Sequence, residues 1–91
     1  MSVHIHYFKT WPEPFAAAAI GMKQYEIRND DRNKMPCVGD LVVLKEWNPM
    51  LGTETGTYTG RELRRRVTHV TAPGEWGLLG NIYVMGLVEA A

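Results

Sequence analysis

A single segment of this chain, "TWPEPFAAAAIG", carries helical periodicity, and its confinement to one early stretch restricts the fold more than any other feature. Pro12 and Pro14 fit only in the first turn of a helix, where their missing N–H groups have no partner to lose. Gly21 is a natural left-handed stop. We therefore predict one short helix, with Thr10 or Trp11 as its cap. Its apolar face consists of four residues at helical spacing: Phe15, Ala18, Ala19 and Met22.

Outside that segment, apolar and polar residues alternate with the period of a strand. Turn-forming Gly, Pro, Asn and Asp residues separate the alternating stretches, which cover residues 3–8, 23–28, 41–47, 61–70 and 82–89. We expect five or six short strands. Closing a sheet removes edges that would otherwise pair with other molecules. The pattern therefore predicts a single mostly β (α+β) domain over residues 1–91, built as a small closed or half-closed barrel with one main helix after the first strand.

The chain has ten basic and ten acidic residues, so its formal net charge is zero. No whole-protein field attracts it to nucleic acid or to an anionic membrane. Its one cysteine, Cys37, excludes an internal disulfide and a cysteine-based zinc site, and we expect a buried, inert thiol there. The longest apolar run is far shorter than the roughly 20 residues of a bilayer span, and the N-terminus does not resemble a signal peptide. We expect a cytoplasmic protein with no membrane partner.

The stretch "IGMKQYEIRNDDR" poses the main question about function. An extended strand places three polar residues on one face, namely Gln24, Glu26 and Arg28. The polar face can be the solvated outer side of a barrel strand, which is the commoner arrangement. Alternatively it is turned into a pocket, where neighbouring charges tune one another for proton transfer. Three further charged residues would then lie close by: Lys23, Asp31 and Arg32.

Three other groups of residues each have two interpretations. The stretch "RELRRR" splits its arginines between two strand faces, Arg64 and Arg66 on one and Arg61 and Arg65 on the other. They form either a solvated face or a stripe that follows nucleic-acid phosphates. The histidines are expected to make ordinary hydrogen bonds rather than a metal site, so we predict no metal and no cofactor; they are His4, His6 and His69. The tryptophans either stack on a base or close the end of a barrel; they are Trp11, Trp47 and Trp76.

Five stretches occur together in a recognisable order: "HYFKTWPEPF", "GMKQYEIRNDDR", "VGD", "LKEW" and "YTGREL". In order and spacing they resemble the ASCH (activating signal cointegrator homology) domain, and in particular its small bacterial and phage single-domain members. The resemblance extends from His6 to about Leu87. ASCH domains are PUA-like barrels with a proposed role in binding RNA or nucleotides. The resemblance therefore implies a five- to six-stranded PUA-like (ASCH) barrel.

ASCH domains have a cleft beside the helix that a "GxKxxExR" segment lines. The resemblance implies that Lys23, Glu26 and Arg28 face a ligand, and that Lys9 enters the cleft from the first strand. Some small bacterial members that this chain resembles are amidohydrolases, which remove the acyl group from N4-acetylcytidine. Their proposed triad is a lysine after the glycine, a threonine three residues on, and a glutamate in the loop before the final strand. Lys23 and Glu75 match this pattern, whereas Glu26 replaces the threonine.

The resemblance thus implies a metal-free amidohydrolase acting on N4-acylated cytidine-type nucleosides. Without the threonine hydroxyl, Glu26 activates a water as general base, Lys23 stabilises the oxyanion, and Glu75 protonates the leaving nitrogen. The predicted substrate-binding residues are Lys9, Trp11, Arg28, Arg32 and Arg61. The alternatives are a non-catalytic RNA- or nucleotide-binding ASCH module and a ribonuclease. We favour the amidohydrolase because a neutral protein with a compact charged cleft suits a small ligand better than a long polyanion.

Overall fold

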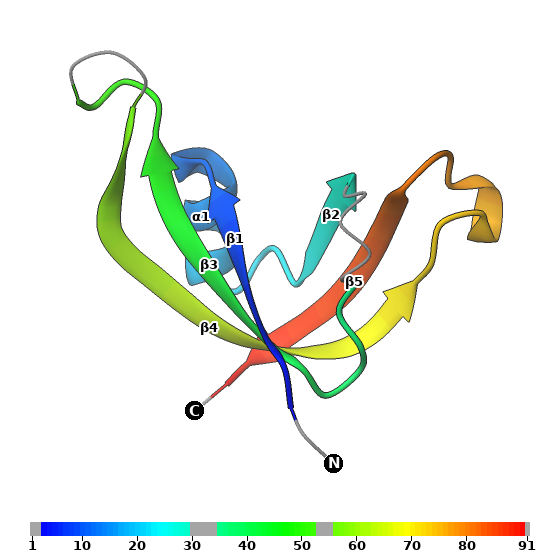
Figure 1. Ribbon diagram of the computed structural model, residues 1–91. Helices are drawn as coiled ribbons and strands as arrows, with labels where there is room; N and C mark the ends of the chain where they lie inside the picture. Colours follow the sequence, from blue (N-terminus) through cyan, green and yellow to red (C-terminus); the bar gives the residue numbers. More distant parts are fainter. Residues whose placement is uncertain (1–2, 30–34, 53–55, 91) are drawn as a thin grey trace.

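A computed structural model describes residues 3–29, 35–52 and 56–90, and it confirms a mostly β fold with one helix after the first strand (Figure 1). Five strands form one sheet in the order β1-β3-β4-β5-β2. β1 runs parallel to β3, and the other neighbouring strands are antiparallel. In chain order the elements are β1 (Ile5–Thr10), α1 (Pro12–Ala19), β2 (Tyr25–Asn29), β3 (Leu41–Asn48), β4 (Thr57–Thr71), the 3-10 turn η1 (Glu75–Gly77) and β5 (Ile82–Glu89).

The sheet curls because β4 is long enough to pair with two neighbours in succession (Figure 1). Its first part pairs with β3 and its last part with β5. Each of these two ladders contains a register shift, one between Lys45 and Trp47 and the other between Val67 and His69. Such shifts bend a strand and increase its local twist. The described strands therefore form the half-closed version of the predicted barrel, with β1 and β2 as its two edges.

Buried apolar side chains fill the concave side of the half-barrel, where α1 packs against β3. The small side chain of Ala18 lets the helix lie close to the sheet. The buried cluster consists of Phe15 and Ala18 from α1 with Phe8, Val42, Leu44, Val67, Tyr83, Met85 and Leu87 from the strands. Four of the five strands contribute to this cluster, and β2 does not.

The helix begins and ends as predicted, although its apolar face is shorter. Trp11 is the N-cap residue, in an extended conformation and without a side-chain cap bond. Gly21, with φ at +83°, turns the chain out of the helix. The chain has therefore left the helical path before Met22, which is 80% exposed, and its predicted place in the apolar face is wrong. No helix in the described part of the chain is long and apolar enough to span a membrane.

Two further predictions need correction. β4 begins at Thr57, four residues earlier than predicted, because Thr57 and Tyr58 pair with the end of β3 even though their Thr- and Gly-rich surroundings resemble a turn. The Cys37 thiol is exposed rather than buried. The Cys37 backbone is held in a turn, since its N–H donates to Asp40 at 2.9 Å and its carbonyl accepts from the Asp40 N–H at 3.0 Å.

Candidate functional site

The charged face of β2 points into the half-barrel. Glu26 lies opposite Met85 of β5 and Arg28 lies opposite Tyr83, and both β5 residues belong to the buried cluster. Side chains at paired positions of neighbouring strands share one face of the sheet. The apolar residues of β2 point outward instead: Tyr25 is 48% exposed and Ile27 58% exposed. For Glu26 and Arg28 the interpretation as a solvated outer side is therefore wrong, because both side chains point into the half-barrel. Gln24, the third residue of the predicted face, is exposed.

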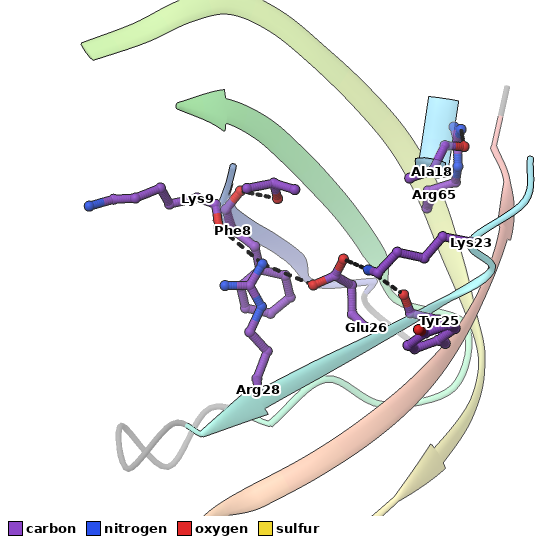
Figure 2. A network of polar contacts seen from close by, with 9 residues as sticks. Phe8, Lys9, Ala18, Lys23, Tyr25, Glu26, Arg28 and Arg65 are labelled. Carbon is purple, nitrogen blue, oxygen red and sulfur yellow. Dashed lines mark hydrogen bonds and ion pairs between the residues drawn. The ribbon is translucent and has the colours of Figure 1, made fainter. Parts of the chain in front are cut away.

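Glu26 is the centre of the group (Figure 2). Its side chain is only 6% exposed and lies between two cations. One carboxylate oxygen accepts a short hydrogen bond from Lys23 Nζ, and the other lies 3.0 Å from an Arg28 terminal nitrogen. A buried carboxylate is tolerated when it is paired and hydrogen-bonded in this way. The arrangement fixes the Glu26 carboxylate at a defined point on the groove floor.

Arg28 bridges the seam, meaning the region between the edge strands β1 and β2. It donates through Nη2 to the backbone carbonyl of Lys9 at 3.1 Å. Its guanidinium also lies over the Phe8 ring, 4.4 Å from the centroid. Arg28 Nε is buried and has no hydrogen-bond partner among the described residues. A planar guanidinium can donate hydrogen bonds and stack on a ring at the same time. Arg28 therefore joins the edge strands β1 and β2, which are not paired with each other in the sheet.

Lys23 reaches Glu26 because the chain turns at Gly21 directly after α1. Lys23 Nζ donates to the Tyr25 carbonyl at 2.8 Å as well as to Glu26, and it lies 4.9 Å from the centroid of the Tyr25 ring. An ammonium has three N–H donors, and the bonds to Tyr25 and Glu26 are the two that Lys23 makes among the described residues. The last turn of α1 is anchored by Arg65, which donates to the Ala18 carbonyl at 3.1 Å (Figure 2). The helix end that delivers Lys23 is thus fixed to β4.

The group forms the floor of a groove of about 350 Å³, hereafter the Lys23 groove. Trp11, which is 55% exposed, and Tyr25 are the aromatic residues that line it. Ligand pockets in proteins typically measure roughly 300–1,000 Å³ and combine apolar walls with a few fixed polar groups. The Lys23 groove therefore matches a small ligand. The residues that line it are Lys9, Thr10, Trp11, Pro14, Lys23, Tyr25, Glu26, Ile27 and Arg28.

Of the predicted site residues, the structure brings Trp11, Lys23, Glu26 and Arg28 together. Lys9 contributes its backbone, but its side chain turns away from Glu26 (Figure 2). Lys9 Nζ lies instead over Trp47, 4.4 Å from the ring centroid. The prediction that the charged Lys9 side chain enters the cleft is therefore wrong.

The other three predicted residues are not in the groove. Glu75 lies in η1, between β4 and β5, and its carboxylate accepts from the Ala72 N–H, so it does not line the groove as predicted. Arg61 is also outside, because it pairs with Glu46. Arg32, together with Asp31, lies outside the described residues.

Sequence reasoning missed a second buried carboxylate, Glu46, whose side chain is 3% exposed. Arg61 donates to it twice, through Nε at 2.8 Å and Nη2 at 2.7 Å, and Thr59 Oγ1 donates at 2.7 Å. The hydrogen bonds from Arg61 and then Thr59 outweigh burial and hold the pKa of Glu46 below its usual value. The signal was present in the sequence, since Glu46 is in phase with Val42 and Leu44 along the strand.

A third carboxylate, Asp40, orders the turn before β3. Burial raises its pKa, but hydrogen bonds from the Cys37 N–H, His6 and the His4 N–H outweigh burial and hold the pKa below its usual value. His6 Nε2 lies 2.9 Å from Asp40 Oδ2, which confirms an ordinary hydrogen bond for this strand histidine. No group of three His, Cys, Asp or Glu residues suited to a metal ion occurs within residues 3–29, 35–52 and 56–90.

These features define a small half-barrel domain with a charged groove at its open seam. The family model described as "Domain of unknown function (DUF3850)" matches residues 5–87, and the chain belongs to this family. A curated relative is the "Uncharacterized 12.9 kDa protein in GpA 3'region" of Escherichia phage P2, which is 34% identical over 76 residues. The match covers 84% of this chain and 62% of the phage protein, so the chain spans less than two thirds of its relative.

Proposed function

We propose that the Lys23 groove binds an N4-acylated cytidine-type nucleoside and hydrolyses its amide. The observation that carries this proposal is the convergence of an ammonium, Lys23, and a buried carboxylate, Glu26, on the floor of a groove of small-ligand size. The resemblance to ASCH amidohydrolases supplies the substrate class, and the half-barrel with its single helix suits a PUA-like domain. We assign the activity to the cytoplasm, because a chain with one cysteine suits a reducing compartment.

The groove suits a flat, polar ligand. Trp11, which lines the groove and is 55% exposed, offers an aromatic face against which a pyrimidine can lie. Among the described residues, Lys23 donates two of its three N–H groups to protein acceptors. In this proposal the third N–H donates to the acyl oxygen of the substrate. Arg28 acts as a positioning residue in this proposal, since it holds Glu26 from the side opposite Lys23.

The proposed reaction is a metal-free hydrolysis in two steps. A water oxygen attacks the acyl carbon while Glu26 takes its proton as general base, and Lys23 donates to the oxyanion of the tetrahedral intermediate. The intermediate collapses by breaking the carbon–nitrogen bond, and the protonated Glu26 returns its proton to the leaving nitrogen. The products are a carboxylic acid and the free 4-amino group. Expulsion is helped because this nitrogen is conjugated with the pyrimidine ring. Glu26 thus takes over the proton donation that the resemblance assigns to Glu75.

The direct test is hydrolysis of N4-acetylcytidine by the purified protein, followed by chromatographic separation of cytidine. We expect Lys23→Ala and Glu26→Gln to lower kcat/KM by about 100-fold or more, as is typical when an oxyanion donor or a general base is removed. Glu62→Gln is the matched control for Glu26→Gln, because its side chain is 48% exposed and lies outside the groove. Circular dichroism of each variant confirms that it is folded.

Two results would contradict the proposal. One is the absence of hydrolysis by the wild-type protein across a panel of N4-acyl cytidines. The other is full activity in folded Lys23→Ala protein. If the wild-type protein binds cytidine or its nucleotides in the groove without hydrolysing any acyl derivative, the non-catalytic nucleotide-binding module replaces the enzyme. Loss of that binding in Arg28→Ala would then identify the same groove as the binding site.

A further inference from the structure

The outer surface of β1, β3 and β4 carries a set of cations and aromatic rings, most of which lie outside the Lys23 groove. The register places Lys9 opposite Lys45 and Lys45 opposite Glu62, and side chains at paired positions share one face. Lys9 and Lys45 alternate with the core residues Phe8 and Leu44, so they point away from the core. We call this surface the outer face; its exposed members are Ile5, Tyr7, Lys9, Tyr58, Glu62, Arg64 and Arg66, with Lys45 and Trp47 half-buried.

The outer face is positively charged although the whole chain is neutral. It carries Lys9, Lys45, Arg64 and Arg66, and Glu62 is the one carboxylate that the described parts of β1, β3 and β4 place there. The other carboxylate of these three strands, Glu46, is buried on the opposite side. Fixed charges separated in this way create a local positive potential that net charge does not reveal.

Both lysines of the outer face lie over aromatic rings. Lys9 Nζ lies 4.4 Å from the centroid of Trp47, and Lys45 Nζ lies 4.9 Å from that of Tyr58. Lys45 is also 3.8 Å from Glu62, the long distance of a weak surface ion pair. Two lysines directly opposite each other on neighbouring strands repel. A bound anion between them would relieve that repulsion.

Trp11 extends this arrangement to the edge of the sheet. Its ring centroid is 5.9 Å from that of Trp47, and its side chain is 55% exposed. Tyr58 is 48% exposed and Tyr7 60% exposed. Exposed flat rings interleaved with cations are the features that bind single-stranded nucleic acids, since bases stack on the rings while Lys and Arg contact the phosphates.

We propose that the outer face binds single-stranded nucleic acid. Lys9, Lys45 and Arg64 contact consecutive phosphates, and Tyr58 stacks with a base. A duplex keeps its bases stacked inside and cannot use this ring, so the single strand is the preferred form. This inference does not depend on hydrolysis in the Lys23 groove, because Lys45, Tyr58 and Arg64 lie outside that groove.

A second copy of the chain is a poorer occupant of the outer face. A two-fold symmetric dimer through this face would pack the same patch against itself. Such packing would bring the lysines and arginines of one copy against those of the other, with one glutamate on each side to neutralise them. A polyanion neutralises all four cations at once. Charge complementarity therefore favours nucleic acid.

The experiment is fluorescence anisotropy of a labelled oligouridine of about 16 nucleotides, the upper end of the site size of a small binding domain, titrated with protein at increasing salt. The expected affinity falls as salt rises. Lys45→Gln and Arg64→Gln should each weaken binding several-fold and reduce the slope of log K against log salt by roughly 0.7, the value for one lost phosphate contact on a single strand. Tyr58→Ala should weaken binding by about 5-fold or more and leave the slope unchanged.

Asn81→Asp is the matched control, because it changes the net charge by the same amount as Lys45→Gln but lies beside the start of β5, away from the outer face. It should bind like the wild-type protein. The proposal is overturned if the wild-type protein does not bind the oligonucleotide at low salt, or if both cation variants bind like Asn81→Asp. A third result would also overturn the proposal: the wild-type protein does not bind nucleic acid, it self-associates in sedimentation experiments, and Tyr58→Ala abolishes this self-association. That result would identify a second copy as the occupant of the outer face.

Discussion

Removing Arg28 tests whether side chains, rather than sheet hydrogen bonds, hold the seam together. Arg28→Ala deletes three interactions: the bond to the Lys9 carbonyl, the ion pair with Glu26 and the stacking on Phe8. A hydrogen bond to a charged group contributes about 1.5–3 kcal/mol, and a cation over an aromatic ring about 0.5–1 kcal/mol at an exposed site. Glu26 keeps Lys23 as a partner, so the cost stays below that of an orphaned buried charge. We expect a loss of about 2–4 kcal/mol of unfolding free energy.

Urea unfolding monitored by tryptophan fluorescence measures this loss, and the melting temperature should fall by about 10–25 °C for a domain of this size. Arg28→Lys should recover less than half, because an ammonium cannot bridge and stack as the guanidinium does. A double-mutant cycle with Glu26→Gln should give a coupling energy of about 1–2 kcal/mol. Arg64→Ala, on the outer face, serves as the control and should change stability by less than about 0.5 kcal/mol. A loss below about 1 kcal/mol for Arg28→Ala, or strict additivity with Glu26→Gln, would refute the reasoning.

Three other measurements test further parts of the structure. The folded-state pKa values of Glu46 and Asp40 are lowered. The stability that these two groups provide is therefore complete above about pH 5 and is lost as the pH falls through the folded-state pKa values. Glu46→Gln should flatten this decline in melting temperature with falling pH. Gly56→Ala should destabilise more than Gly39→Ala in urea unfolding, because both glycines have positive φ but only at position 56 would a Cβ clash, 2.6 Å from Pro49 Cα. Cys37 should react completely with a thiol reagent in the native protein, and a need for denaturant would contradict its exposed position.

The strands made of nearly continuous apolar runs could be predicted from the sequence almost to the residue. The strand at residues 82–89 matches β5, and that at residues 41–47 matches β3 within one residue. In both, a run of apolar and β-branched residues between turn-forming residues marks the strand. The start of β4 was missed because Thr57, Tyr58 and Thr59 favour a strand but stand between two glycines, which favour a turn. Pairing with β3 decides their conformation.

The candidate site was only partly predictable, for a similar reason. The sequence showed that Glu26 and Arg28 share a face but left open which way that face points, since the alternation has the same period in either orientation. The partner strand β5 decides the question. Met85 and Tyr83 lie opposite Glu26 and Arg28 and belong to the core, so the two charged residues face the core as well. The Lys9 side chain was misplaced because Trp47, far away in sequence, competes for its ammonium.

Two features have one physical basis: β2 turns its charged residues inward and its apolar residues outward, and the barrel does not close completely. An apolar inner face on β2 would add to the core and draw the edge strands together, and a sealed core has no room for a ligand. The charged inner face works against full closure, because a sealed seam would remove the remaining hydration of Lys23 and Arg28, which are 17% and 23% exposed beside the buried Glu26. Arg28 then holds the two edges at a fixed separation through the Lys9 carbonyl. Stability and ligand access therefore depend on the same three side chains, and a variant that replaces them with apolar residues should gain packing at the seam only by losing the groove.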